Sequence, residues 1–107
     1  MEFDKSSVFD LAKSVSYSDN ATVSKMVIKK QTGNITLFAF DSGQSLSEHS
    51  APFDAFVQVI EGTGRIIINK QDYDLSAGEC IVMPANIPHA VQAIEKFKMM
   101  LVMIRGN

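Results

Sequence analysis

The side chains in this sequence best suited to chemistry are two histidines that lie forty positions apart, His49 and His89. They are the only histidines in the chain. Near neutral pH an imidazole can ligate a divalent transition metal, accept a hydrogen bond or transfer a proton. No serine or cysteine lies in a nucleophile motif, and the sequence has no glycine-rich phosphate-binding loop. The question is therefore which elements bring these two imidazoles together.

Those elements are predicted to be short β-strands separated by turns. Apolar and β-branched runs predict strands over 23–30, 35–40, 45–50, 55–60, 65–69, 73–75, 80–83, 90–94 and 98–104. Turn residues predict breaks at 32–34, 61–64, 70–72 and 77–78, and we assign Gly43, Gly62, Gly64 and Gly78 to turns. This close, regular spacing favours an all-β sandwich or barrel. We expect one domain, with residues 1–22 as an N-terminal arm (a short helical turn or an irregular segment) and residues 23–107 as the barrel.

The composition of the 107-residue chain excludes several classes of protein. Hydrophobic residues make up 46% and charged residues 21%, which is typical of a folded globular domain. A net charge of -2 offers no basic surface, so we expect neither nucleic-acid nor membrane binding. Cys80 is the only cysteine, which excludes an intrachain disulfide. The N-terminus has no signal-peptide pattern and no apolar run reaches transmembrane length, so we expect a cytoplasmic protein.

The surroundings of the two histidines resemble the two motifs of small single-domain cupins (type-2 conserved barrels, RmlC-like jelly rolls). Gly43, His49 and Gly62 match the first motif, and Gly78, Pro84 and His89 match the second. The resemblance implies a double-stranded β-helix, in which two antiparallel sheets close around a pocket. It also implies a homodimer.

The sequence departs from both motifs at positions that matter for metal binding. In metal-binding cupins the positions matching 49, 51, 55 and 89 hold a divalent ion such as Fe, Ni, Mn or Zn. Here Ala51 and Ala55 replace a histidine and a glutamate, which leaves a depleted set of two ligands, His49 and His89. In the second motif Asn86 replaces a glycine and Ala93 an asparagine. Catalytic zinc sites usually keep three protein ligands.

Few other side chains could complete such a site. Asp54 lies beside Ala55, and strand alternation should point both Asp54 and Gln58 away from the interior. Glu48 neighbours an inward His49 and has the same difficulty. The facing of Cys80 is left open.

The resemblance predicts a ligand pocket lined by His49, Ala51, Ala55, Val57, Met83 and His89. We expect a small-molecule-binding protein without a full three-histidine, one-glutamate centre. The alternative is a metal-dependent enzyme of the dioxygenase, isomerase or lyase type, with a two-histidine metal centre. A third possibility is a filled barrel, in which Phe53 or Met83 occupies the space beside the two alanines. Whether the protein is an enzyme, and which ligand it takes, stay open.

The segment Val57 to Ile60 has apolar residues on both faces, which indicates a strand covered on both sides. The barrel interior would cover one face. A partner subunit would cover the other, which favours a homodimer, although a second sheet of the same chain is a rival cover.

Overall fold

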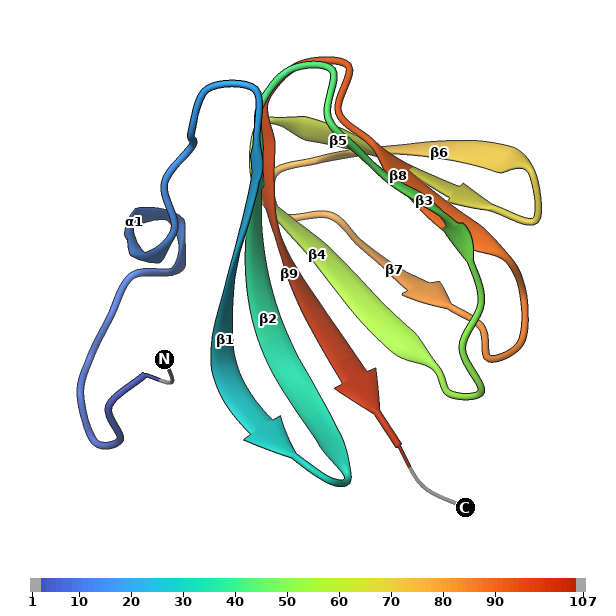
Figure 1. Cartoon of the computed structure of the whole chain (residues 1–107). Coiled ribbons are helices and arrows are strands. Elements are labelled where there is room, and N and C mark those ends of the chain that lie inside the picture. Colours follow the sequence, from blue (N-terminus) through green and yellow to red (C-terminus); the bar gives the residue numbers. More distant parts are fainter. Residues whose placement is uncertain (1–2, 106–107) are drawn as a thin grey trace.

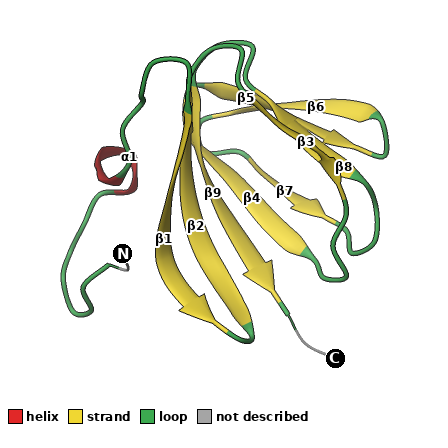
Figure 2. Ribbon diagram, viewed as in Figure 1, coloured by secondary structure: helices red, strands yellow, loops and turns green. Residues whose placement is uncertain are grey.

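The computed structural model describes residues 3–105 and is built almost entirely from β-strands (Figures 1 and 2). One short helix, α1, precedes nine strands in the described part of the chain. The elements are α1 (Leu11–Ser14), β1 (Thr22–Lys30), β2 (Gly33–Phe40), β3 (Ser45–His49), β4 (Ala55–Glu61), β5 (Thr63–Ile68), β6 (Gln71–Ser76), β7 (Cys80–Met83), β8 (His89–Gln92) and β9 (Phe97–Ile104). Every predicted strand is present.

The strands form two antiparallel sheets that face each other (Figure 1). The five-stranded sheet has the order β1-β2-β9-β4-β7, and the four-stranded sheet has the order β3-β8-β5-β6. From β2 onward the chain crosses repeatedly between the sheets, so strands distant in sequence become neighbours. This is the antiparallel jelly-roll barrel that the sequence predicts.

Two stacked phenylalanine rings fill one end of the barrel interior, which we call the phenylalanine end. Phe40 on β2 and Phe97 on β9 are fully buried, and their rings stack with centroids 4.8 Å apart and planes 8° apart. Phe38 stacks on Phe40 at 5.7 Å. The opposite end, where β3 finishes at His49 and β8 begins at His89, is the histidine end.

The phenylalanine end corrects the assignment of Gly64 to a turn. Gly64 is buried within β5, and a Cβ added there would lie 2.2 Å from Cε2 of Phe97. This position therefore needs glycine because the Phe97 ring occupies the space of a side chain. Gly43, Gly62 and Gly78 do lie outside the strands, with φ values of 84°, 76° and 92°.

Two predicted turns are also displaced. The β5–β6 hairpin turns at Asn69 and Lys70, whose φ values of 50° and 66° fit a two-residue turn, so β6 begins two residues earlier than expected. The β1–β2 hairpin turns before Gly33, so Asn34, which we expected in a turn, lies within β2. Asn34 is only 8% exposed.

The N-terminal arm covers part of the outer face of the five-stranded sheet (Figure 1). Val15 of the arm is 1% exposed and belongs to an outer cluster with Leu37 and Ala39 of β2, against which Ile60 of β4 packs. The arm therefore covers the outer face of β4 near Ile60. From the sequence, a partner subunit or a second sheet of the same chain was expected to cover that face. Lys98 on β9 fixes the arm by donating from Nζ to the carbonyl of Ala12.

Candidate functional site

The two histidines meet as neighbours across the β3–β8 ladder. His49 is the last residue of β3 and His89 is the first of β8, and the two are register partners. Their ring centroids lie 4.4 Å apart, with the planes at 66° in an edge-to-face arrangement. His89 is 8% exposed, whereas His49 is exposed at the rim. The pair therefore has one buried ring inside the barrel and one solvent-exposed ring at its rim.

Both rings are held by the same local hydrogen bond. Nδ1 of His49 lies 2.7 Å from the carbonyl oxygen of Ser47, and Nδ1 of His89 lies 3.3 Å from that of Ile87. A carbonyl oxygen can only accept, so this network assigns the proton of each neutral imidazole to Nδ1. Each Nε2 is then left with a lone pair, at the corner of the ring farthest from its own backbone.

The environment of His89 favours its neutral form. Burial is the main cause that lowers the pKa of His89 below its ordinary value, and the neighbouring His49 lowers it further. The carbonyl of Ile87 acts in the opposite direction because it stabilises a protonated ring. At neutral pH His89 is therefore an acceptor at Nε2 rather than a cation.

The acidic residues nearest to His49 in the sequence, Glu48 and Asp54, form contacts with groups other than the two histidines. An oxygen of Asp54 accepts from the backbone N–H of Ala85 at 2.8 Å, which ties the β3–β4 loop to the β7–β8 loop. Both carboxylate oxygens of Glu48 lie 3.4 Å from Nζ of Lys70. Among residues 3–105, no group of three or more His, Cys, Asp or Glu side chains is arranged to hold a metal ion. The donor set therefore does not fit the four-ligand centre of metal-binding cupins.

The two alanines lie on the opposite side of the same end of the barrel. Ala55 begins β4 and is paired with Met83 on β7 and Met103 on β9. Ala55 and Met83 are buried in the main core cluster, and Met103 packs against it. Ala51 is half-buried in the β3–β4 loop, where its carbonyl accepts from the N–H of Asn86 at 2.7 Å. Thioether side chains thus flank the position where a carboxylate is missing.

The remaining predicted pocket residue, Val57, is fully buried one inward position deeper on β4. Phe53 is half-buried in the β3–β4 loop, with its ring 5.2 Å from the guanidinium of Arg105. Gln58 lies on the outer face, because it pairs with the outward Met100. The fold therefore gathers the predicted residues at the histidine end but buries Val57 and Met83 in packing.

One inward polar residue was missed by the sequence analysis. Asn34 pairs with Met103, which places it in the same cross-strand row as Ala55 and Met83. Its Oδ1 atom is buried and has no hydrogen-bond partner among residues 3–105. The Gly-Asn turn signal concealed it, and an inward polar residue is recognisable only after the hairpin register is known.

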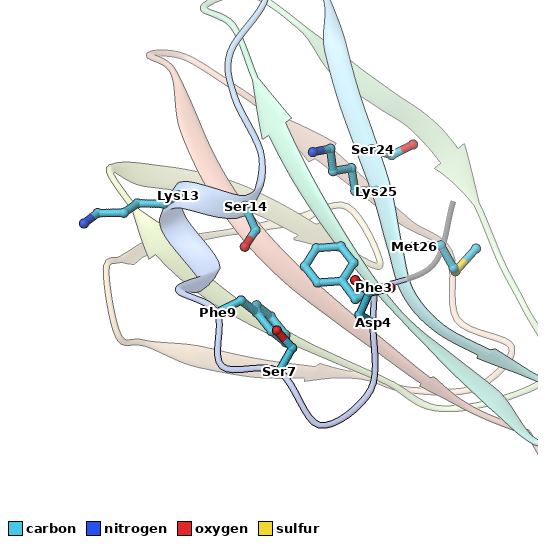
Figure 3. A pocket seen from close by; sticks show the side chains of 9 residues that line it. All are labelled: Phe3, Asp4, Ser7, Phe9, Lys13, Ser14, Ser24, Lys25 and Met26. Carbon is cyan, nitrogen blue, oxygen red and sulfur yellow. The ribbon is translucent and has the colours of Figure 1, made fainter.

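A surface hollow of about 550 Å³ lies elsewhere, between the arm and β1 (Figure 3). Phe3 and Phe9 meet there edge to face, with centroids 4.7 Å apart. Figure 3 shows the side chain of Lys13 extending away from these rings, and Met26 points to the other side of β1. The polar groups that line the hollow do not converge on one point, so we interpret the hollow as the groove left where the arm packs against β1.

Comparison with known proteins gives consistent matches. The cupin-domain family profile matches residues 36–105, which includes both histidines. A conserved protein of unknown function from Streptococcus pyogenes is 36% identical, with a TM-score of 0.92 over 98% of this chain and 92% of that one. A cupin 2 conserved barrel domain protein from Leptotrichia buccalis is 40% identical, with a TM-score of 0.88 over 91% of this chain. This chain spans 47% of the Leptotrichia protein, about half its length.

A more distant match concerns the fold alone. Salicylate 1,2-dioxygenase from Pseudoaminobacter salicylatoxidans is 16% identical, with a TM-score of 0.73 over 87% of this chain and 28% of that one. A comparison with curated proteins returned no match. Within residues 3–105, no helix is long and apolar enough to cross a membrane. The family profile extends over most of the barrel and agrees with the antiparallel topology, so the chain belongs to the cupin family.

Proposed function

We propose that this cupin binds a small molecule at the histidine end of its barrel, and that His49 and His89 are its principal polar contacts. The observation that carries the proposal is the imidazole pair, 4.4 Å apart, with both Nδ1 atoms engaged by backbone carbonyls. Two preoriented rings at the rim of an apolar interior fit the general character of ligand sites, which combine apolar walls with a few convergent polar groups.

The chemistry of the pair restricts what it recognises. With Nδ1 protonated and tied down, each Nε2 accepts a hydrogen bond from an O–H or N–H group. The lowered pKa of His89 supports this acceptor role at neutral pH. A ligand hydroxyl on an apolar body is therefore the simplest match, and the same Nε2 atoms could take up its proton in a general-base role.

The test uses phenol as the probe, because it presents one O–H on an apolar ring. Titration of the 15N-labelled full chain by NMR should shift amide signals of β3, β4 and β8. His49→Ala and His89→Ala should each weaken phenol binding about threefold to tenfold, as expected for one lost hydrogen bond. Lys70→Ala is the control, since it alters a neighbouring charge without touching either ring. Unchanged phenol affinity in both histidine variants would refute the proposal.

A two-histidine divalent metal centre in an enzyme is the second candidate. It is supported by the two Nε2 atoms left free to ligate, and opposed by the two alanines and by the engaged carboxylates of Asp54 and Glu48. Elemental analysis of protein purified without a polyhistidine tag, before and after incubation with Fe, Ni, Mn and Zn, separates the two. A stoichiometric metal that is lost in His89→Ala would replace the first proposal with the second.

We also propose that the partner of this chain is a second copy of itself, bound through the outer face of the five-stranded sheet. One row of register partners crosses all five strands there and is entirely apolar: Ile28, Ile35, Val102, Phe56 and Val82. Ile28 and Val82 are 44% and 56% exposed, so the arm does not cover the ends of this row. We place the protein in the cytoplasm, a proposal that cell fractionation would test.

A further inference from the structure

We propose that Asp54, in the β3–β4 loop 50–54, is a positioning residue of the ligand site, which holds His49 beside His89 without touching the ligand itself. Its carboxylate binds the β7–β8 loop 84–88. This inference rests on the proposed function, because a fixed separation of the two imidazoles matters for binding only if one ligand contacts both rings.

The β-sheet alone holds His49 weakly. β3 is an edge strand, and β8 is its one sheet neighbour in the described part of the chain. The ladder between them is irregular, because the register shifts between Leu46 and His49 before His49 meets His89. His49 is also exposed and is the last residue of its strand. Poorly buried strand ends open more easily than strand centres, so the position of His49 depends on the loop that follows it.

The two loops connect directly to the two histidines. Loop 50–54 begins at the residue after His49, and loop 84–88 ends at the residue before His89. A bond between the loops, together with the His49–His89 register pair, therefore closes a ring of chain at the histidine end of the barrel. If the loops separated, His49 would be attached to β8 only through the irregular end of the ladder.

The loops are joined by two consecutive backbone N–H groups. Asn86 adopts a left-handed conformation with a φ of 65°, and the N–H groups of Ala85 and Asn86 both donate to loop 50–54. Oδ1 of Asp54 accepts from Ala85 at 2.8 Å, and the carbonyl of Ala51 accepts from Asn86 at 2.7 Å. Successive N–H groups at such turns favour an anionic acceptor, which the Asp54 carboxylate supplies.

The Asp54 carboxylate is the part of this contact that a substitution can remove. Among residues 3–105, it makes the one side-chain hydrogen bond between the two loops. Asp54 is exposed, so its carboxylate does not fill space in the core. A hydrogen bond to a carboxylate is stronger than one between neutral groups. Replacement of Asp54 should therefore loosen the two loops while the barrel stays folded.

The direct measurement is the contact between the two imidazoles. Because their centroids lie 4.4 Å apart, ring protons of His49 and His89 should give a nuclear Overhauser effect in NMR spectra of the full chain at pH 8. Asp54→Ala should lose most of this signal. Asp54→Asn should keep it, because the amide oxygen can still accept from the N–H of Ala85. Loss of the signal in both variants, or in neither, would overturn the inference.

The effect on binding is measured with phenol, the probe used for the histidine pair. Asp54→Ala should raise the Kd of phenol about threefold to tenfold, because the paired arrangement of the rings is then populated only part of the time. Asp54→Asn should stay within about twofold of the wild-type Kd. Glu48→Gln is the matched control. It also removes a carboxylate charge beside His49 but leaves both loop bonds, so the Kd and the ring signal should not change.

Two outcomes separate this inference from the proposed function. If His49→Ala and His89→Ala weaken phenol binding but Asp54→Ala binds phenol as the wild type does, the proposed site stands and the role of Asp54 is wrong. If neither histidine substitution changes the Kd, the proposed function fails, and the positioning role fails with it. Equal weakening in Asp54→Ala, Asp54→Asn and Glu48→Gln would mean that charge, rather than the position of His49, controls binding, which also contradicts the proposal.

Discussion

The two histidines are fixed in the same way although they come from different segments. In each, Nδ1 faces the carbonyl two residues earlier in the chain, Ser47 for His49 and Ile87 for His89. Such a contact sets both the direction of the ring and the position of its proton. The fold therefore delivers two acceptors of known orientation, which is a stronger basis for recognition than two freely rotating side chains.

The burial of His89 predicts a pH dependence of stability. Its pKa is lower in the folded chain than the ordinary 6.5, so below that pH the unfolded chain binds more protons. The contribution of neutral His89 to the free energy of unfolding should be fully present above about pH 7. The free energy of unfolding should then fall as the pH decreases through 6.5, with a slope of at most about 1.4 kcal/mol per pH unit for this one group. Urea unfolding between pH 8 and pH 5 measures it.

Replacement of each histidine shows which residue is responsible. His89→Gln should flatten the decline between pH 7 and pH 5. His49→Gln should preserve the larger part of it, because burial rather than His49 is the main cause of the lowered pKa. If the decline is as steep in His89→Gln as in the wild type, other groups produce it.

Among the elements, β5 depends on the close approach of Gly64 to the Phe97 ring. Phe97 is fully buried and stacked on Phe40, so it has little room to move. Gly64→Ala should therefore destabilise the fold by about 1–3 kcal/mol, as overpacking usually does. The measurement is urea unfolding of the single variant and of the same substitution in a Phe97→Leu background, where the penalty should shrink. An equal penalty in both backgrounds would contradict a clash with the ring.

The contact between the arm and β9 is the second element-scale feature. Lys98 is 8% exposed, donates to the carbonyl of Ala12 and lies 3.8 Å from a carboxylate oxygen of Glu61. The hydroxyl of Tyr17 donates to the same oxygen at 2.7 Å. Nζ of Lys96 and Nζ of Lys98 lie 5.0 and 4.9 Å from the centroid of the Tyr17 ring.

These contacts predict different effects for the two lysines. Lys98→Ala should cost about 1–3 kcal/mol of unfolding free energy, because it leaves the Ala12 carbonyl without its donor and removes the cation beside the Glu61 carboxylate. It should also make the arm more sensitive to limited proteolysis. Lys96→Ala, at an exposed position beside the same ring, should change stability by less than about 0.5 kcal/mol. Equal effects would mean that the exposed cation–π contacts hold the arm instead.

The sequence predicted the elements better than their ends. Strands such as β2 and β9 are recognisable because β-branched and aromatic residues concentrate in them. The turn at Asn69 and Lys70 was misplaced because a lysine with positive φ carries no composition signal. The histidine pair was predictable because glycines and prolines fix its spacing. Asn34 was not, because its facing depends on where the β1–β2 hairpin turns.

At the scale of the whole molecule, the apolar row on the outer face predicts association. The purified chain should have twice its 11.8 kDa mass by light scattering coupled to size-exclusion chromatography. Val82→Glu, which places a charge in the row at an already exposed position, should yield the monomer with little loss of fold. Ile94→Glu is the control, since Ile94 is 63% exposed but lies in the β8–β9 loop. A monomeric wild type, or dissociation by both substitutions, would refute a second copy on this face.

The unequal ends of the barrel also have a bearing on how this protein can change over generations. Stacked rings without spare volume secure one end, whereas the other is lined by short, thioether and imidazole groups. A saturation library should therefore show a gradient along the strands, intolerant near Phe40 and permissive near Ala55. Substitutions near the histidine end would then change ligand specificity in related barrels while the fold is retained.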